Sequence, residues 1–399
     1  MKKRVLFYKI KKYLEHKNAL VIVGMRQVGK TTLMQALFKE ISSSKKLWFD
    51  LDNPLDQKIF ENEDYESIYE ILAEQARLSS KKERLYVFID EMQNFPEITK
   101  IIKFLIDHYK VKFVVTGSSA FYLKNLFPES LSGRKFLYKL DPLSFKEFLY
   151  FRGLVSLKDI LNKKIDYTID KKIDFVRFKK REVEYEEYLR FGGFPEVVLT
   201  KNIDTKKEIL KNIFASFFEK DLVLLSDFSD IREIRDLILL LAPRVGSRIS
   251  ISKLASELRI NRPKVYSYLE FLEGIFFIRF LSKFSNNIGR SIVGGKKIYF
   301  ADTGILNVVG NVNDAQLLEN AVVNQLGQYG ELSFYNKRNT SEIDVILDKK
   351  KCFEIKLTGT QSDERRLQKI AKSIKLQEAF IVSKNFREDI VNVIYPQFL

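Results

Sequence analysis

One segment near the N-terminus constrains the fold more than any other. It reads "NALVIVGMRQVGKTTLMQALFKEI" and places an apolar run over residues 19–23 directly before the pattern G-x-x-x-x-G-K-T at residues 24–31. Apolar residues then recur at helical spacing at Leu33, Leu37 and Ile41. The order strand, glycine-rich loop, helix is typical of a phosphate-binding loop, and it predicts an α/β fold with a parallel sheet between helices.

The residue types of this loop suit a bound triphosphate. Glycines let backbone N–H groups curl around phosphate oxygens, and the start of the following helix adds partial positive charge. Lys30 is expected to reach the β- and γ-phosphates of ATP, and the Thr31 hydroxyl to hold Mg²⁺. The alternative, a chance glycine-rich turn, is disfavoured by the full eight-residue match. The predicted ATP-binding residues are Gly24, Met25, Arg26, Gln27, Val28, Gly29, Lys30, Thr31 and Thr32.

A pair of acidic residues follows a second buried strand. The continuous apolar run 86–89 is typical of a parallel strand buried on both faces, and it ends in Asp90 and Glu91. Because ligands of open α/β sheets bind at the carboxyl ends of the strands, Asp90 is predicted to hold Mg²⁺ and Glu91 to activate the attacking water. Taken alone, the pair could instead be an acidic helix start.

Three further polar residues are candidates near the phosphates. Thr116 and Ser118 lie in the stretch "VKFVVTGSSA", which contains a buried strand, where they could sense the γ-phosphate or position water, although Ser118 fits equally well as a helix N-cap. Arg134 precedes another strand and could touch the γ-phosphate, in its own chain or in a neighbouring copy, or be a plain surface arginine.

Composition bounds the class of protein. The 399 residues predict two to three domains, with 45% hydrophobic and 30% charged residues as in ordinary globular chains. The single Cys352 excludes an internal disulfide framework, and no apolar run is long enough for a membrane helix, so a cytoplasmic location is expected. Lys and Arg exceed Asp and Glu by 68 − 52 = 16, which fits either a nucleic-acid partner or a lysine-rich solvated surface.

The motifs occur in an order that resembles a known family. "GMRQVGKTTL", "FIDEMQNFPE", "VTGSSAFYL", "LSGRKFLYKLDPLSFKEFL" and "GGFPEVV" are similar to those of archaeal and bacterial AAA-type ATPases that carry a C-terminal restriction-endonuclease-like domain. The resemblance spans essentially the whole chain. It implies that the "VVTG" strand lies between the strand of the phosphate loop and the strand ending in Asp90. It also implies phosphate binding at residues 24–31, metal binding by Asp90 and water activation by Glu91. Met25 stands where relatives often have Pro.

The middle of the chain is predicted to be mostly helical over residues 144–248. It contains a basic stretch with interleaved aromatics, in which Tyr167, Phe175 and Phe178 could stack on nucleic-acid bases. Aromatics that face the core are the favoured alternative. "GGFPEVV" predicts a tight turn before a helix and has no assigned chemistry.

Residues 249–297 are predicted to form a winged helix. Ser250 or Ser252 can cap a first helix, and Asn261 can cap a second. The second helix would present Arg262, Lys264 and Ser267 to the DNA major groove. The apolar run "IFFIRFLS" is interpreted as the β wing. A packing or protein-docking module of the same shape is the alternative.

The last third has the predicted order αβββαβ over residues 298–399, which is the core of restriction-endonuclease-like nucleases. Asp344 falls on the second strand of this unit, and Glu354 and Lys356 alternate to one face of the third. Two carboxylates make a hard oxygen site for a second Mg²⁺, Lys356 would orient water, and Glu319 could complete the cluster. The alternatives are a surface hairpin or a decayed nuclease kept for binding.

These observations predict four segments: an ATPase core at 1–143, a helical lid or linker at 144–248, a winged helix at 249–297 and a nuclease-like domain at 298–399. The expected function is Mg²⁺-dependent ATP hydrolysis that controls nucleic-acid binding or cleavage, with DNA favoured. The alternative is an ATP-operated interaction switch whose C-terminal domain only binds DNA or protein. Whether the chain cleaves nucleic acid and whether it forms homo-oligomers are left open.

Overall fold

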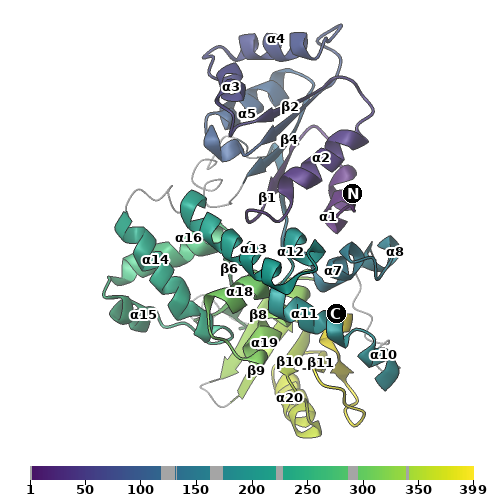
Figure 1. The fold of residues 1–399 in the computed structure, drawn as a ribbon, viewed down its shortest axis with the longest axis vertical. Coiled ribbons are helices and arrows are strands. Elements are labelled where there is room, and N and C mark those ends of the chain that lie inside the picture. The colour runs from purple at the N-terminus through teal and green to yellow at the C-terminus, as the bar shows by residue number, and fades with distance from the viewer. Residues whose placement is uncertain are drawn as a thin grey trace. The chain divides into compact units, whose positions relative to one another are not determined.

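The computed structural model describes residues 2–117, 131, 133–161, 174–221, 228–285, 295–337 and 341–399. The chain divides into two compact units (Figure 1). The first comprises Met1–Asp141 with Gly274–Phe276, and the second comprises Pro142–Glu273 with Phe277–Leu399.

The first unit is built on a five-stranded parallel sheet of order β2-β3-β4-β1-β5. Its strands are β1 (Ala19–Val23), β2 (Lys46–Asp50), β3 (Leu85–Asp90), β4 (Val111–Gly117) and β5 (Lys135–Lys139). The three central strands are buried along their whole length, as their continuous apolar runs require. Strand β4 lies between β1 and β3, which confirms the predicted strand order.

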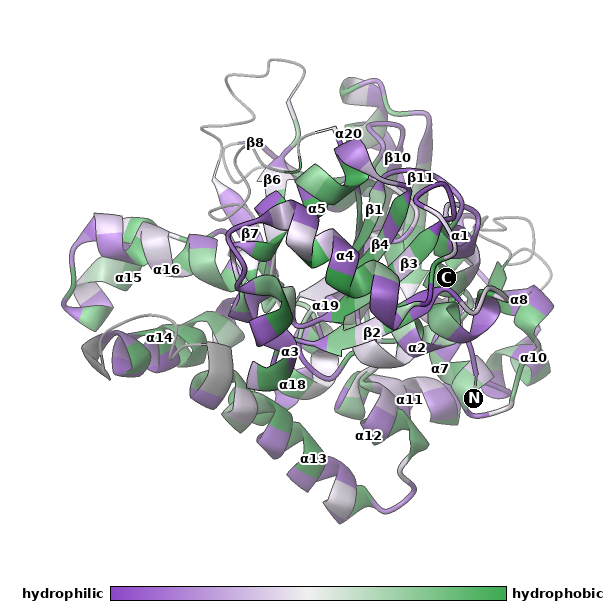
Figure 2. Ribbon diagram, turned by 90° about the horizontal axis from the view of Figure 1, so that it is seen from above, coloured by the Kyte–Doolittle hydropathy of each residue, from purple (hydrophilic) through white to green (hydrophobic). Residues whose placement is uncertain are grey.

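Amphipathic helices complete the first unit. They are α1 (Val5–Lys11), α2 (Lys30–Glu40), α3 (Pro54–Gln57), α4 (Tyr65–Gln75) and α5 (Ile98–His108), with short 3₁₀ turns at Lys58–Phe60 and Met92–Asn94. Helix α5 shows the pattern well, because Ile98, Ile101, Ile102 and Leu105 are buried in the core while hydrophilic residues occupy its other side (Figure 2).

The second unit begins with helices, and the predicted helical character of residues 144–248 is confirmed in the part described. The helices before the sheet are α7 (Phe145–Phe151), α8 (Leu157–Leu161), α10 (Phe175–Lys179), α11 (Glu182–Phe191), α12 (Pro195–Leu199), α13 (Ile203–Ser216), a π-helical turn at Phe217–Asp221, α14 (Phe228–Leu241), a 3₁₀ turn at Ala242–Arg244, α15 (Ile251–Leu258) and α16 (Arg262–Gly274). Of the predicted stacking aromatics, Phe178 is buried against Phe386 and Tyr395, so it faces the core. Phe175 is half exposed, and Tyr167 lies outside the described residues.

A seven-stranded mixed sheet of order β12-β11-β10-β9-β8-β6-β7 organises the rest of the second unit. Its strands are β6 (Ile278–Lys283), β7 (Lys296–Phe300), β8 (Leu332–Lys337), β9 (Ser341–Leu347), β10 (Lys351–Lys356), β11 (Glu378–Ser383) and β12 (Val393–Ile394). Helices α18 (Thr303–Val309), α19 (Asp314–Leu326) and α20 (Gln361–Ser373) and a 3₁₀ turn at Pro396–Phe398 accompany them. The order α19-β8-β9-β10-α20-β11 confirms the predicted αβββαβ sequence of elements.

The run predicted to be the β wing forms strand β6 of the larger sheet. Strand β6 pairs antiparallel with β7 and parallel with β8, so the hairpin belongs to the seven-stranded sheet. The reason lies in its apolar content, since Phe277, Ile278 and Leu281 are all buried, which a solvated wing could not achieve. The predicted boundary between residues 297 and 298 falls inside β7. The two preceding helices agree with the sequence, with Ser250 and Asn261 accepting the capping hydrogen bonds.

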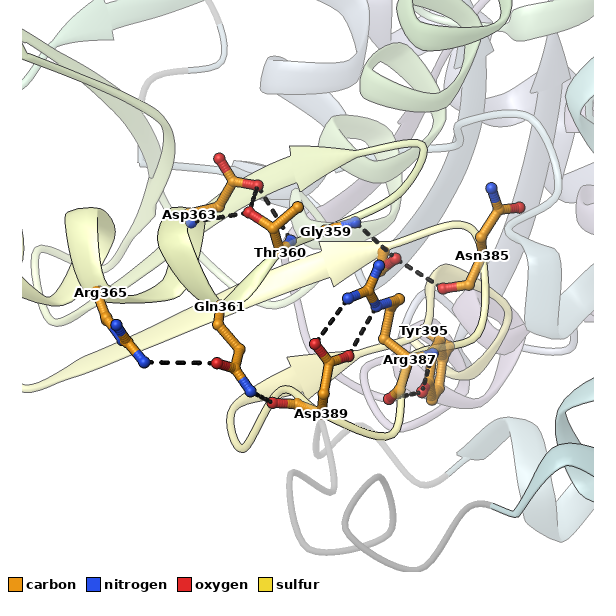
Figure 3. A network of polar contacts seen from close by, with 10 residues as sticks. Gly359, Thr360, Gln361, Asp363, Arg365, Asn385, Arg387, Asp389 and Tyr395 are labelled. Atoms are coloured by element: carbon orange, nitrogen blue, oxygen red, sulfur yellow. Dashed lines mark hydrogen bonds and ion pairs between the residues drawn. The ribbon is translucent and has the colours of Figure 1, made fainter.

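A polar network fixes the start of α20 against the β11–β12 connection (Figure 3). Thr360 and Asp363 form a reciprocal capping box, and the Arg387 guanidinium holds both oxygens of Asp389 at 2.8 and 2.7 Å. Gln361 donates from the helix to the Asp389 carbonyl at 2.9 Å. These bonds order the loop together with the packing of Phe386 and Ile390 on the core. Across the described parts of the chain, no helix is long and apolar enough to cross a membrane.

Candidate functional site

The glycine-rich loop joins the end of β1 to the start of α2 in a shape that depends on its glycines. A Cβ atom at Gly24 would lie 2.2 Å from the Leu140 carbonyl oxygen, so no larger residue fits there. Gly29 has a φ of 93° and caps α2, which begins at Lys30. The loop therefore leads directly into the N-terminus of α2, and its backbone N–H groups together with this helix end form the arrangement that binds phosphate.

The Lys30 side chain is folded into the loop. Its Nζ donates to the carbonyl oxygens of Gly24 at 3.1 Å and of Met25 at 3.0 Å, and the residue is 5% exposed. These carbonyls hold the ammonium beside the place where loop N–H groups would meet phosphate.

The acidic edge of the sheet is tied to the loop through two hydroxyl groups. Asp90, at the end of β3, is 4% exposed and accepts hydrogen bonds from the hydroxyls of Thr116 and Thr31. Burial raises the pKa of Asp90, and the nearby carboxylates of Glu91 and Asp50 raise it further. Thr31 and Asp90, predicted together as metal ligands, therefore lie in direct contact.

Glu91 follows in a left-handed backbone conformation with a φ of 52°. Its N–H donates to Thr116 Oγ1 at 3.1 Å, and its carboxylate accepts a hydrogen bond from the Gln93 side chain. Thr116 thus binds both members of the acidic pair and fixes their relative position. A left-handed conformation at a non-glycine residue costs free energy, and such strain is typical of functional positions.

The sequence analysis did not predict two residues of this site, Asp50 and Arg4. Asp50 pairs in register with Asp90 at the carboxyl end of β2, and its signal was the same one, an acid that ends an apolar strand. Arg4 is 8% exposed and donates to the Val28 carbonyl in the loop at 3.0 Å and to the Asp141 carbonyl at 2.8 Å. Arg4 braces the loop, and nothing local in the basic N-terminal stretch distinguishes it.

Of the alternatives for Arg134, the structure does not support contact with the phosphate loop of its own chain. Strand β5 runs parallel to β1. Arg134 precedes β5 and therefore lies near the start of β1, at the opposite end of the strands from the loop that follows Val23. Its Nε donates to Asp107 Oδ1 at 2.6 Å. Ser118, the other predicted catalytic residue, lies outside the described residues.

The second cluster lies in the seven-stranded sheet, where β9 and β10 separate. Their pairing ends at Val345 opposite Phe353, and Asp344 Oδ2 then accepts a hydrogen bond from the Ile355 N–H at 2.9 Å. Glu354 is 4% exposed, and burial raises its pKa to about 7, with Asp344 adding to the effect. The sheet brings the predicted residues Asp344 and Glu354 close enough to interact electrostatically.

The remaining predicted members also belong to this cluster, Lys356 through Glu354 and Glu319 through Asp344. Glu354 Oε1 lies 3.0 Å from Lys356 Nζ and 2.5 Å from Arg366 Nη2. Glu319 accepts a hydrogen bond from the Tyr299 hydroxyl at 2.7 Å, and burial together with Asp344 raises its pKa. Sequence reasoning found Glu319 and Lys356 but missed Arg366 and Tyr299.

A second Mg²⁺ does not fit these side chains as they are arranged. Among the residues that the structure describes, no group of three or more His, Cys, Asp or Glu side chains could hold a metal ion. The oxygens of Asp344 and Glu354 already meet an N–H group or cations. The ATP site differs, because there one carboxylate, one hydroxyl and the phosphates themselves can share the ion.

The predicted DNA-contacting residues of α16 have different surroundings. Lys264 Nζ pairs with Asp230 at 2.9 Å and Glu233 at 2.6 Å on α14, so its charge is compensated within the chain, and its role in DNA contact stays a prediction. Arg262 and Ser267 are exposed.

The backbone of the "GGFPEVV" motif lies against the buried carboxylate of Asp302. The Asp302 carboxylate accepts hydrogen bonds from the N–H groups of Gly193 at 2.7 Å and Ile305 at 3.1 Å. A Cβ atom at Gly192 would collide with this carboxylate, and one at Gly193 would lie 2.1 Å from the Leu143 carbonyl oxygen. Burial raises the pKa of Asp302 to about 6 against the pull of its N–H donors. The motif therefore has a structural role that its sequence did not reveal.

Comparison with known proteins agrees with the geometry of the first site. The sequence model of an AAA domain matches residues 16–149, and that of a domain of unknown function matches residues 182–316. The chain is 30% identical over 373 residues to the uncharacterized protein MJ1544 of Methanocaldococcus jannaschii, covering 89% of this chain and 79% of that protein. It is 28% identical to an uncharacterized protein of Haemophilus influenzae, covering 82% of this chain and 79% of the relative.

The comparison with solved structures also matched two proteins from Thermotoga maritima. The RuvB Holliday junction branch migration motor has 17% identity and a TM-score of 0.32, covering 69% of this chain and 88% of that one. Domain III of the replication initiation protein DnaA has 16% identity and a TM-score of 0.28, covering 52% and 89%.

Proposed function

The chain belongs to the same family as the uncharacterized Methanocaldococcus protein and carries an AAA domain, and from this premise we propose that it is a Mg²⁺-dependent ATPase whose nucleotide state controls nucleic-acid binding. The observation that carries the ATPase part is the contact between loop and acidic edge. Thr31 at the start of α2 bonds Asp90 at the end of β3, and Glu91 follows directly.

The proposed roles follow from this arrangement. Loop N–H groups and Lys30 bind the β- and γ-phosphates, and Lys30 exchanges its carbonyl partners for phosphate oxygens. Thr31 and Asp90 would hold Mg²⁺, which when bound neutralises charge on the phosphates. Once the Glu91 carboxylate gives up its hydrogen bond from Gln93, it orients and deprotonates the attacking water.

The proposed partner is nucleic acid, with DNA favoured. The support is the net charge of +16, which produces a field that attracts a polyanion. Arg262 and Ser267, exposed at the start of α16, are the proposed contacts.

The test combines ATP turnover with nucleic-acid binding. Phosphate release by the purified chain should require Mg²⁺. Binding of duplex DNA, single-stranded DNA and RNA should be measured with ATP, with ADP and without nucleotide across a salt series. An affinity that changes with nucleotide and falls steeply with salt supports the proposal, and an affinity independent of both contradicts it.

A second candidate is favoured by the cations in the C-terminal cluster. If Glu354 and Asp344 serve only to order Lys356 and Arg366, the second unit binds nucleic acid or protein without cutting it. Incubation with plasmid DNA and Mg²⁺ separates the candidates. Cleavage that is lost in Asp344→Ala indicates a nuclease, and intact plasmid with retained binding indicates a switch.

A further inference from the structure

Lys297 is a buried cation that the predicted nuclease site does not account for. It lies on β7 and is 2% exposed, whereas its neighbour Lys296 on the same strand faces solvent. An ammonium group is costly to bury without partners, so its surroundings should contain compensating charge.

Three carboxylates from two other elements provide that charge. The Nζ atom lies 2.7 Å from Glu342 Oε1, 3.6 Å from Asp344 Oδ1 and 3.7 Å from Glu319 Oε1. Glu342 and Asp344 lie on β9, and Glu319 lies on α19. Lys297 is thus the cation around which these acids gather, with a hydrogen bond to one and electrostatic attraction to the other two.

The balance of burial and attraction favours the charged lysine. Burial alone disfavours the ammonium, but Glu319 and Asp344 offset this and raise the pKa of Lys297. Its ammonium is tethered to the sheet and shielded from solvent, and therefore does not exchange as a dissolved ion would.

A divalent ion at this place would compete with the lysine for the same oxygens. Mg²⁺ requires oxygen atoms at about 2.0–2.1 Å in near-octahedral geometry. Glu342 Oε1 and Asp344 Oδ1 already face Lys297, and the other Asp344 oxygen accepts from Ile355.

We propose that the Lys297 ammonium is a built-in cation that takes the place of a divalent metal among Glu319, Glu342 and Asp344. The second unit then engages its partner without a metal ion of its own, and removal of the lysine opens a divalent-cation site. The inference rests on this cluster and not on ATP hydrolysis, so the two can fail separately.

The test counts bound Mn²⁺ by electron paramagnetic resonance without nucleotide, so that ATP binding plays no part. Wild type and Asp344→Asn should bind the same number of ions per chain. Lys297→Met should bind one more, and Lys297→Met combined with Asp344→Asn should lose it again. Lys296→Met, the matched control on the same strand, should match wild type.

Two results would overturn the proposal. The first is a wild-type Mn²⁺ ion that Asp344→Asn removes, which needs no variant at Lys297 and therefore holds even if Lys297→Met does not fold. The second is a folded Lys297→Met protein that gains no ion.

Discussion

Lys30 and Lys297, which belong to different units, are both buried but have opposite kinds of partner. Lys30 donates to backbone carbonyls of its own loop, whereas Lys297 faces carboxylates from other elements of the second unit. Carbonyl oxygens are neutral, so a phosphate can replace them with a gain in charge attraction. Carboxylates already neutralise their lysine, so nothing is gained by exchanging them. The first site is arranged to receive a ligand, and the second is already occupied by the chain itself.

The acidic residues of the two regions also differ in the charge of their partners. Burial raises the pKa of Asp90, the nearby Glu91 and Asp50 raise it further, and its carboxylate accepts hydrogen bonds from the hydroxyl groups of Thr116 and Thr31. Glu354 has two cations on one oxygen. Repulsion among acids is present in both regions, but Lys356 and Arg366 already compensate Glu354, whereas neutral hydroxyl groups bind Asp90 and leave charge for Mg²⁺ to neutralise.

The largest expected effect is at the acidic edge. Glu91→Gln keeps the shape of the side chain but removes the base, so ATP hydrolysis should fall by about 10²–10⁴-fold while ATP binding persists. Phosphate release and nucleotide calorimetry measure the two. Glu97→Gln, at an exposed position nearby, should leave both unchanged. Full activity in Glu91→Gln would remove the proposed role.

Loss of the cation in the second region should act on stability. Lys297→Met leaves Glu319, Glu342 and Asp344 facing one another, and unfolding in urea should show a loss of about 3 kcal/mol, the lower end for a broken buried pair because Glu342 is half exposed. Added Mn²⁺ should restore part of this stability, and Lys296→Met should lose little. A Lys297→Met protein as stable as wild type would show that the carboxylates do not depend on this lysine.

Lys30→Ala tests the exchangeable lysine. It removes the cation meant for the phosphates, so hydrolysis should fall by about 10²–10³-fold, with stability nearly unchanged. Lys39→Ala, exposed on the same helix, is the control. Turnover that survives Lys30→Ala would place ATP chemistry elsewhere.

Asp302 extends the comparison to a buried carboxylate held by backbone N–H groups. Its pKa rises from 3.8 to about 6 on folding, so its contribution to stability is full below about pH 4 and is lost as pH rises through about 6. The change amounts to about 3 kcal/mol. Urea unfolding of Asp302→Asn between pH 4 and 7 should lack this slope, while the exposed control Asp314→Asn should keep it. An unchanged slope in Asp302→Asn would contradict the assignment.

Much of the fold could be predicted from local sequence patterns. The strand–loop–helix at the first site and the αβββαβ order of the last third are periodic signals within short windows, and the structure reproduces both. The pairing of the predicted wing with the larger sheet could not be predicted, because a strand pattern does not say which sheet a strand joins, and β6 joins β8 from a later segment.

The candidate site residues also divide into those that a local sequence pattern marks and those that only the three-dimensional fold brings together. Thr31 and Asp90 were found because strand ends and loop motifs mark them locally. Lys297 was missed because its partners on α19 and β9 come together only in three dimensions. The position of Arg134 could not be predicted locally, because its distance from the loop depends on the direction of β5 in the sheet.

The most direct test of the account is a crystal structure with Mg²⁺ and a non-hydrolysable ATP analogue. Lys30 Nζ should leave the carbonyls of Gly24 and Met25 and lie about 2.7–3.2 Å from a β- or γ-phosphate oxygen, while Lys297 keeps its contact with Glu342. A nucleotide bound elsewhere, with Lys30 still on its two carbonyls, would contradict the account.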